Sequence, residues 1–483
     1  MAIIDELKIF DENLITKLNQ LAANKIEYWD IKAGLGLGTN LDFTDQKSKE
    51  ISSYEIKECG IRTFINGGWG FNVLKDLSKN SIIGGFEEAI KLARLSESLC
   101  DNKFKIKERD PLIQNFKINS KKNIENIDIK DKIDQIKLQE KIASEYSPKI
   151  KNTHTVYIDG NGYNVFLNSF GSYIYQELSV LRLFSLVYAQ ENGILQRAVN
   201  SVGGLGGFEI IETPQAIKLS SKSAKEAVEL LKAKSPVGGK FTLIMDPKMS
   251  GTFIHEAFGH AVEADLVLNK ESLLEGKIGE KVAIEDVNII DNPTMGHGKR
   301  FHLPYELFGC YFIDDEGIPS QKTSIIENGI LKNYLHSLET SSRMELSPNG
   351  HGRASSNSSR PQVRMGFTYL EPKDWSLEEM MEDTKNGILV KDFQYGYCDP
   401  STGNFQFKCK ISYKIKDGEK EELMRDVALS GMTLEVLNRI SAIGNLDTFG
   451  FSDGMCGKGG QGVRVCDGGP YIRIENVTVG GLN

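Results

Sequence analysis

The feature that most constrains this 483-residue chain is the segment His255–His260, which reads His-Glu-Ala-Phe-Gly-His. Ser250 and Thr252 are suitable N-caps just before it, and the apolar residues around it recur at helical spacing. Two histidines five positions apart point about 140° away from each other on an ideal α-helix. Both imidazoles can therefore reach one metal ion only if the helix is kinked, bulged or ended between them.

Gly259, immediately before His260, permits such a break through its backbone freedom or a one-residue π-bulge. Two neutral imidazoles bind a divalent metal such as zinc, and a neighbouring carboxylate can take a proton from a metal-bound water. The segment therefore predicts a hydrolytic metal centre with His255 and His260 as ligands and Glu256 as the base. A pair of unrelated, partly buried histidines is the alternative interpretation.

A third metal ligand has to come from another part of the chain. Cys456 lies in the glycine-dense segment 454–462, where a thiolate can approach a metal without side-chain crowding. Cys466, His297 and His302 are competing candidates. Two histidines and one cysteine would leave a fourth tetrahedral position for water, as a catalytic zinc site requires.

The composition is ordinary for a globular protein, with 40% hydrophobic and 26% charged residues. A net charge of −8 argues against nucleic acid as the main partner, because phosphate recognition needs a basic surface. The chain has no apolar run near 18 residues and an acidic start, so we expect no membrane span and no signal peptide. Seven cysteines without framework spacing favour a reducing, cytoplasmic environment.

The succession of patterns predicts an α+β fold of two domains. Residues 1–235 mix helical and strand-like segments, which indicates an N-terminal α/β domain with a mixed sheet. Within it, the charged stretch 101–150 is expected to be a helical insertion or a mobile segment. Pro236–Gly239 is the preferred boundary, and residues 236–483 predict a β-rich, barrel-like or sandwich-like domain that carries the kinked metal-binding helix.

Local periodicity also predicts individual elements of the N-terminal domain. An amphipathic helix is expected over 7–24, followed by short strands and hairpins to about residue 74. Helices are expected over 86–100 and 221–235, and Asp159–Gly162 has the composition of a turn.

Several segments together resemble the TldD/PmbA family of metalloproteases. The histidine segment continues as HEAFGHAVEAD, MCGKGGQ follows about two hundred residues later, and IRIENVTVGG lies near the C-terminus. Cys59–Phe71 is similar to a glycine-containing hairpin of the family, and His351–Met365 is similar to its central polar loop. The likeness runs along nearly the whole chain.

The resemblance implies a ligand set and a mechanism. One subfamily carries H-E-x-x-x-H and the catalytic metal, whereas its paralogue lacks the motif and serves as a partner; this chain keeps the motif. By resemblance, His255, His260 and Cys456 bind one zinc ion per chain, and Glu256 acts as the base. The resemblance also implies unfolded or extended polypeptides as substrates, cleaved inside a closed homodimer or a heterodimer with a paralogous subunit.

Other polar residues near these segments have open roles. Glu263 or Asp265 could accept a hydrogen bond from a ligand imidazole, or both could face solvent. Arg353, Arg360 and Arg364 could orient a peptide carboxylate or carbonyl, or could be solvated at the surface.

A serine hydrolase is a competing interpretation, because Gly450–Gly454 matches the pattern G-x-S-x-G around Ser452. That pattern requires a following helix and a later histidine, but glycines follow and the last histidine is His351. We therefore attribute this match to chance.

The combined prediction is a zinc-dependent peptidase, with two alternatives. One is a non-catalytic, metal-stabilised peptide-binding subunit of a protease, which loss of the glutamate or of a ligand would favour; both are present. The other is an amidase for small molecules, which a narrow closed pocket would favour over a long groove.

Overall fold

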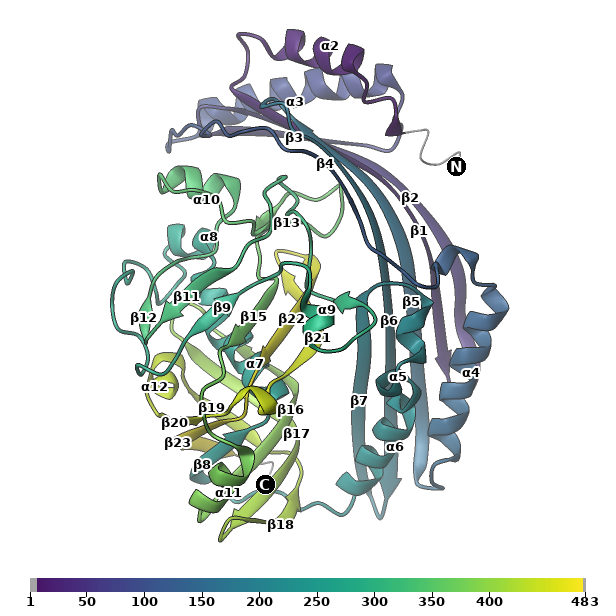
Figure 1. Ribbon diagram of the computed structural model, residues 1–483, viewed down its shortest axis with the longest axis vertical. Helices are drawn as coiled ribbons and strands as arrows, with labels where there is room; N and C mark the ends of the chain where they lie inside the picture. The colour runs from purple at the N-terminus through teal and green to yellow at the C-terminus, as the bar shows by residue number, and fades with distance from the viewer. Residues whose placement is uncertain (1–6, 481–483) are drawn as a thin grey trace.

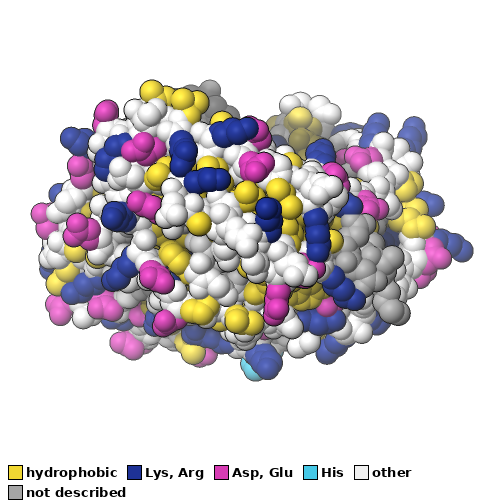
Figure 2. Space-filling model, turned by 90° about the horizontal axis from the view of Figure 1, so that it is seen from above, with side chains coloured by type: hydrophobic (Ala, Val, Ile, Leu, Met, Phe, Trp, Pro, Cys, Tyr) yellow, Lys and Arg dark blue, Asp and Glu magenta, His cyan; other side chains and the backbone are white. Residues whose placement is uncertain are grey.

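The computed structural model describes residues 7–480 and has an α+β architecture, as the sequence predicts (Figure 1). A long curved sheet forms the N-terminal part and arches over a β-rich C-terminal part. None of the helices within residues 7–480 has the length and apolar character needed to cross a bilayer. On the face seen in Figure 2, basic and acidic side chains are intermixed rather than segregated by sign.

The N-terminal sheet has the strand order β10-β7-β6-β5-β1-β2-β3, with β4 beside β6. Its strands are β1 (Tyr28–Thr44), β2 (Lys47–Ile65), β3 (Gly68–Leu74), β4 (Ile113–Lys117), β5 (Ile150–Asn168), β6 (Tyr173–Glu191), β7 (Ile194–Leu205) and the short β10 (Glu306–Leu307). Strand β4 is parallel to β6 and the other pairs are antiparallel, so the sheet is mixed as expected.

The strands before residue 74 are far longer than predicted, since β1 has 17 residues and β2 has 19. The predicted turn at Asp159–Gly162 is also wrong, because this segment lies inside β5 and Gly160 pairs with Gly38 of β1. Glycines occur here for packing: a Cβ on Gly38 would lie 2.3 Å from the ring of Tyr54. Turns and close contacts both select glycine, so composition alone misassigns such a segment.

Four helices, α2 (Glu12–Ala22), α3 (Lys79–Leu99), α4 (Ile129–Glu145) and α6 (Leu219–Leu230), cover the outer face of the sheet within residues 7–480. Alternate residues of β6 show the two faces of the sheet: Leu183 shares a core cluster with Ile136 of α4, whereas Arg182 reaches Asp453 of the C-terminal part. The inner face is therefore turned toward the C-terminal part.

Two predicted helices have different starts in the structure. Helix α2 begins at Glu12 rather than residue 7, because the side chain of Asp11 accepts a hydrogen bond from the backbone N–H of Leu14. Helix α3 begins at Lys79 rather than residue 86, because Ser78 caps it. The pair Gly84-Gly85 in its first turns conceals this start in the sequence.

The charged stretch 101–150 contains β4 and α4 and packs on the sheet. Two of its charged side chains are buried against β5: Lys132 pairs with Asp159 at 2.6 Å, and Glu140 accepts a hydrogen bond from Thr155 at 2.6 Å.

We propose 1–235 and 236–483 as the two domains. Strand β10 belongs to the second of these ranges and pairs with β7 at the edge of the N-terminal sheet.

The C-terminal part contains a closed barrel, because β16 pairs with both β8 and β17. Its strands are β16 (Asn386–Cys398), β8 (Gly239–Met245), β23 (Ile472–Gly480), β19 (Ala428–Met432) and β17 (Asn404–Lys416), with β18 (Glu419–Met424) beside β17 and β20 (Ile440–Ile443) beside β23. The β-rich, barrel-containing C-terminal part that the sequence predicts is thus confirmed.

A second C-terminal sheet has the order β12-β11-β9-β15-β22-β21. Its strands are β12 (Ile330–Leu331), β11 (Thr323–Glu327), β9 (Ile289–Asp291), β15 (Phe367–Leu370), β22 (Gln461–Gly469) and β21 (Gly450–Lys458). Shorter elements complete the chain: α5 (Pro214–Ile217), α8 (Ala264–Leu268), α9 (His297–Arg300), α10 (Leu338–Arg343), α11 (Leu377–Asp383), α12 (Thr433–Leu437) and the pair β13 (Gly352–Arg353) and β14 (Gln362–Val363).

Helix α7 (Pro247–Phe253) lies between the barrel and the second sheet. Phe253 packs edge-on against Phe405 of β17, with ring centroids 5.4 Å apart. On the other side, Gly251 contacts the backbone of Gly468 in β22 so closely that a Cβ would lie 2.5 Å from its nitrogen. The helix that leads into the histidine motif is therefore held from both sides.

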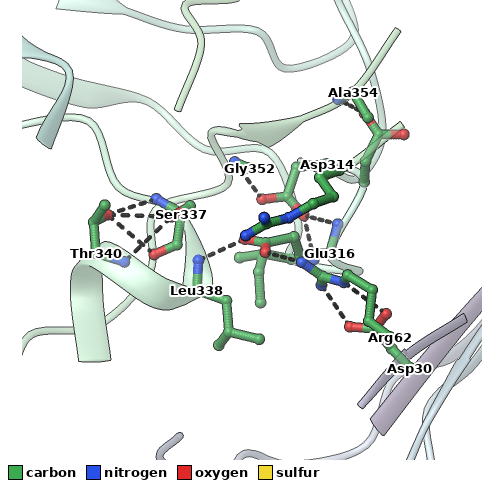
Figure 3. A network of polar contacts seen from close by, with 12 residues as sticks. Asp30, Arg62, Asp314, Glu316, Ser337, Leu338, Thr340, Gly352 and Ala354 are labelled. Carbon is green, nitrogen blue, oxygen red and sulfur yellow. Dashed lines mark hydrogen bonds and ion pairs between the residues drawn. The ribbon is translucent and has the colours of Figure 1, made fainter. Parts of the chain in front are cut away.

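A buried ion-pair network joins the two parts (Figure 3). Arg62 of β2 donates to Asp30 of β1 at 2.9 Å and to Glu316 of the C-terminal part at 2.7 Å. Glu316 also accepts a hydrogen bond from the backbone N–H of Leu338, the first residue of α10. Removing Arg62 would leave two buried carboxylates without their cation, so this network fixes how the sheet sits on the C-terminal part.

We expect Gly251→Ala to destabilise the protein by about 1–3 kcal/mol, because the new methyl group meets backbone atoms of β22 that cannot rotate away. The matched control is Gly84→Ala in α3, where a Cβ would meet nothing within 4 Å. That change should stabilise by about 0.5–1 kcal/mol through helix propensity. Chemical denaturation of both variants measures the two effects, and an unchanged Gly251→Ala would contradict the close contact.

Candidate metal centre

The helix changes form at the histidine motif, as the five-residue spacing requires. After α7 ends at Phe253, a π-helical turn, η3 (Ile254–Phe258), is followed by a 3₁₀ turn, η4 (Gly259–Val262). The backbone N–H of Gly259 bonds to the carbonyl of Ile254, five residues earlier. The wider turn brings residues five apart toward the same side, and the predicted break is confirmed.

Gly259 sits where this change occurs, and its site has no room for a side chain. A Cβ there would lie 2.1 Å from the sulfur of Met365. The two imidazoles that flank the break, His255 and His260, have ring centroids 5.3 Å apart and planes at 87°. The helix break therefore sets the two rings edge to face on one side of the backbone.

Cys456 of β21 completes a cluster with these histidines. One donor atom from each of His255, His260 and Cys456 lies within 4.8 Å of the other two, and the thiol sulfur is 3.3 Å from Nε2 of His260. His255 is 2% exposed, and its Nδ1 is buried without a hydrogen-bond partner among the described residues. Two imidazoles and one thiol that converge in this way fit a divalent metal such as zinc.

The competing ligand candidates lie elsewhere. Cys466 is buried in another core cluster, where its sulfur accepts from the backbone N–H of Gly309, and burial raises the pKa of its thiol. Nε2 of His297 lies 3.0 Å from the carbonyl oxygen of Asn292. His302 is at a left-handed backbone position with φ of 57°. Among residues 7–480, the donor cluster includes none of these three side chains.

Glu263 orients the ring of His260. Its Oε2 is 3.0 Å from Nδ1 of His260 and accepts a hydrogen bond from Lys458 at 3.0 Å. With Nδ1 bonded to a carboxylate, Nε2 is the nitrogen that faces Cys456. Of the two acidic candidates, Glu263 therefore contacts the imidazole, whereas Asp265 contacts Lys458 at 2.7 Å.

Lys458 was not predicted as a site residue, but it links the strand that carries Cys456 to Glu263, the carboxylate beside His260. It lies two residues after Cys456 on the same strand, and its ammonium donates to Glu263, Asp265 and the carbonyl of Val363. Glu263 is completely buried, so this ammonium neutralises a carboxylate that water does not reach. A possible sequence signal is the i, i+2 spacing, which puts Cys456 and Lys458 on one face of a strand.

Two of the three candidate arginines are structural. Arg364 is fully buried and donates hydrogen bonds to the backbone carbonyls of Cys456 and Gln461. These hydrogen bonds stabilise the β21–β22 hairpin. Arg353 is also buried and donates to the carbonyl of Met365. Neither guanidinium is free to orient a substrate, while Arg360 is exposed.

The cluster is strongly polarised. Burial alone would raise the pKa of the Cys456 thiol, but the charge of His255 and hydrogen bonds from both histidines lower it to about 4. Burial would likewise lower the pKa of His255, yet the Cys456 thiolate and Glu256 raise it to about 9. These shifts favour a Cys456 thiolate beside protonated imidazole near neutral pH, so a cation that binds here has to displace a proton from the ring.

A cavity of about 250 Å³ lies in front of the cluster, between the two parts of the protein. Glu256, His255 and Cys456 line one side, and Arg182, Phe184 and Ser201 of the N-terminal sheet line the other. Ser452 also lines it, but this residue lies inside β21 and donates to Asp467. No helix follows it within the described chain, so the nucleophile-elbow arrangement is not formed.

Comparison with known proteins assigns the chain to a family. Residues 122–234 match the PmbA/TldA metallopeptidase central domain, and residues 238–481 match the PmbA/TldA metallopeptidase C-terminal domain. The chain belongs to the PmbA/TldD family of metallopeptidases.

Relatives in this family match the chain over most of their length. A metalloprotease of Methanothermobacter thermautotrophicus is 37% identical, with 95% of this chain and 96% of the relative covered. A metalloprotease of Methanocaldococcus jannaschii is 38% identical, with 92% and 96% covered. A zinc metalloprotease TldD homolog of Saccharolobus solfataricus is 29% identical, with 97% and 99% covered.

Two solved structures share the fold of this chain. TldE from Thermococcus kodakarensis superposes with a TM-score of 0.74 at 17% identity, over 97% of this chain and all of that chain. A putative modulator of a DNA gyrase from Thermotoga maritima superposes with a TM-score of 0.74 at 19% identity, with the same coverage. At these identities the likeness establishes the fold alone.

We expect Lys458→Met to weaken zinc binding about 10–100-fold, because Glu263, the carboxylate that orients His260, loses the ammonium group that holds it. It should also destabilise the protein by about 1–3 kcal/mol, since the fully buried Glu263 loses its ammonium partner and keeps only its contact with His260. Competition with a chelator measures the zinc affinity. The control is Lys277→Met, which removes an exposed ion pair with Glu280 and should leave the zinc affinity unchanged. Wild-type zinc affinity in Lys458→Met would rule out this role.

We also expect zinc affinity to rise with pH between about 6 and 9. A metal binds only neutral imidazole. The pKa of His255 is raised to about 9. Burial would lower the pKa of His260, but the charge of Glu263 raises it well above its usual value. Both rings must therefore lose a proton when a metal binds at neutral pH. The thiol pKa near 4 contributes no such dependence in this range. Chelator competition at several pH values tests the slope; an affinity that is constant from pH 7 to 9 would contradict the raised pKa.

Proposed function

We propose that this chain is a zinc-dependent peptidase that hydrolyses peptide bonds of unfolded or extended polypeptides. The observation that carries the proposal is the convergence of His255, His260 and Cys456 beside Glu256 at an accessible cavity. The Saccharolobus relative, described as a zinc metalloprotease TldD homolog, supports zinc as the metal. The single three-donor cluster found within residues 7–480 supports one ion per chain.

In this mechanism, His255, His260 and Cys456 hold the metal, and Glu256 handles the proton. Zinc, when bound, supplies Lewis-acid chemistry that polarises a carbonyl and makes water more acidic. The carboxylate of Glu256 accepts the proton of the attacking water and passes it to the leaving amine. Glu263 keeps Nδ1 of His260 occupied, so that the ring offers Nε2 to the metal throughout.

The neighbourhood of the cluster supports an extended polypeptide as the substrate. Strand β21 is the last strand in the order of its sheet, and its residues Ser452–Cys456 line the cavity. An exposed strand edge aligns an extended peptide through main-chain hydrogen bonds, with little demand on sequence. The cavity also adjoins a second one, which favours a groove over the closed pocket of a small-molecule amidase.

We further propose a dimer, either of two such chains or with a paralogous subunit. The similarity in fold to TldE supports a partner of the same architecture. A cytoplasmic location is supported by the cysteines, all seven of which lie within residues 7–480 and are free.

The decisive test compares wild-type protein with Glu256→Gln for zinc content and for cleavage of an unfolded polypeptide, read by mass spectrometry. We expect about one zinc per chain in both, and a fall in cleavage of at least about a hundredfold in the variant, because its amide cannot accept the proton. Glu271→Gln, which changes an exposed glutamate, is the matched control and should retain activity.

Other outcomes of this comparison are equally informative. Zinc in both proteins without cleavage in either would favour the non-catalytic subunit or a missing partner chain. Protein without zinc in both cases would contradict the metal centre itself.

A further inference from the structure

The cavity at the metal centre continues into a second and larger one. This second cavity, about 530 Å³, shares Asn200, Ser201, Lys248 and Asp453 with the first. Apolar side chains such as Leu219, Tyr305 and Phe451 form part of its wall. Lys218, Lys222 and Lys248 also line it, so this cavity is rich in ammonium groups.

The ammonium groups of Lys248 and Lys222 have no acceptor within hydrogen-bond distance among the described residues. Among the described residues, the ion pair of Lys248 is with Asp392 at 3.8 Å, which is too long for a hydrogen bond. Lys222 is 3.8 Å from Glu226 in the same way. Their side chains are 33% and 51% exposed, so both ammonium groups remain accessible from the cavity.

The nearby carboxylates are engaged by other cations. Lys410, which is buried, donates to Asp392 at 3.1 Å and pairs with Glu226 at 2.9 Å. Asp453 accepts from Arg182 at 2.9 Å. The carboxylates of Asp392 and Asp453 raise the pKa of Lys248, whereas burial, followed by repulsion from the ammonium group of Lys248, lowers the pKa of Lys222. An added carboxylate would relieve this repulsion.

The position of Lys248 in the chain shows how far its ammonium group lies from the candidate metal centre. Lys248 is the second residue of α7, seven positions before His255. At 1.5 Å per helical residue, this separation is about 10 Å along the axis. An extended peptide advances about 3.3 Å per residue, so the distance corresponds to about three substrate residues.

We propose that Lys248 and Lys222 bind a carboxylate of the substrate about three residues from the scissile bond. The carboxylate belongs either to the C-terminus of the peptide or to an Asp or Glu side chain. The apolar wall contacts the side chains next to it. This specificity rests on the proposed peptidase function.

The test measures binding of fluorescently labelled decapeptides to zinc-loaded Glu256→Gln protein by anisotropy. One neutral peptide ends in an amide, a second has a free C-terminal carboxylate, and a third is the amide with one internal glutamate. We expect at least one carboxylate peptide to bind about tenfold more tightly than the neutral amide. The comparison of the second and third peptides identifies the source of the carboxylate.

Variants then locate the site. Lys248→Met combined with Lys222→Met should remove the preference while binding of the neutral peptide is retained. Lys225→Met, on the same helix as Lys222 but in an exposed pair with Glu229, should preserve it. Higher salt should reduce the preference, because the ammonium groups are partly exposed. Equal binding of all three peptides, or a preference that survives the double variant, would overturn the proposal.

Cleavage of the same peptides by the wild-type protein separates this inference from the proposed function. Carboxylate-dependent binding without cleavage would support the lysine site and contradict the peptidase. Cleavage of all three peptides without any difference in binding would support the peptidase and contradict the lysine site.

Discussion

The spacing of the two histidines is the constraint on which the centre of this protein depends. Residues five apart cannot share one face of a regular α-helix, so the backbone has to widen into a π turn between His255 and His260. Packing fixes the position of α7, the helix that leads into this turn. Gly251 contacts the backbone of β22, and Phe253 packs against β17. The barrel and the second sheet thus hold the helix before the point where it changes form.

The position of the third candidate ligand, Cys456, depends on contacts between segments that are far apart in the chain. Cys456 reaches His260 from 196 residues away, on a hairpin whose carbonyls are held by Arg364. Lys458 ties the same hairpin to the carboxylate that orients His260. One buried guanidinium and one ammonium therefore establish the relative position of donors that belong to different elements. Arg364 also satisfies buried backbone carbonyls, and Lys458 neutralises the buried carboxylate of Glu263, so neither kind of group is buried without a partner.

The candidate metal centre belongs to the C-terminal part, but the cavity in front of it is lined by both parts of the chain. The candidate ligands lie on η3 and η4, which continue α7, and on β21, whereas the opposite wall of the cavity comes from β6 and β7. The ion pairs of Arg62 with Glu316 and of Arg182 with Asp453 join the two parts, and the second of these pairs lines the cavity. The substrate groove proposed here is consequently a product of how the sheet sits on the barrel-containing part.

The sequence by itself determined the α+β class, the β-rich C-terminal part, the helix break at Gly259 and, through resemblance to a family, the histidine and cysteine cluster. These features follow from short periodic patterns and from motifs whose residues are close in the chain. From the residues alone, Cys456 could not be separated from Cys466, because both are isolated cysteines in glycine-rich strands. Their different environments result from pairing between distant segments.

Only the tertiary structure decided the length of the N-terminal strands, the burial of Arg364 and the role of Lys458. Glycine within a strand has the same local pattern as glycine in a turn, and only the neighbour that fills its empty side, such as Tyr54 at Gly38, distinguishes them. An arginine or lysine is likewise compatible with solvent, substrate or a buried carbonyl. Which of these it meets depends on contacts between residues far apart in the chain, which local sequence patterns do not encode.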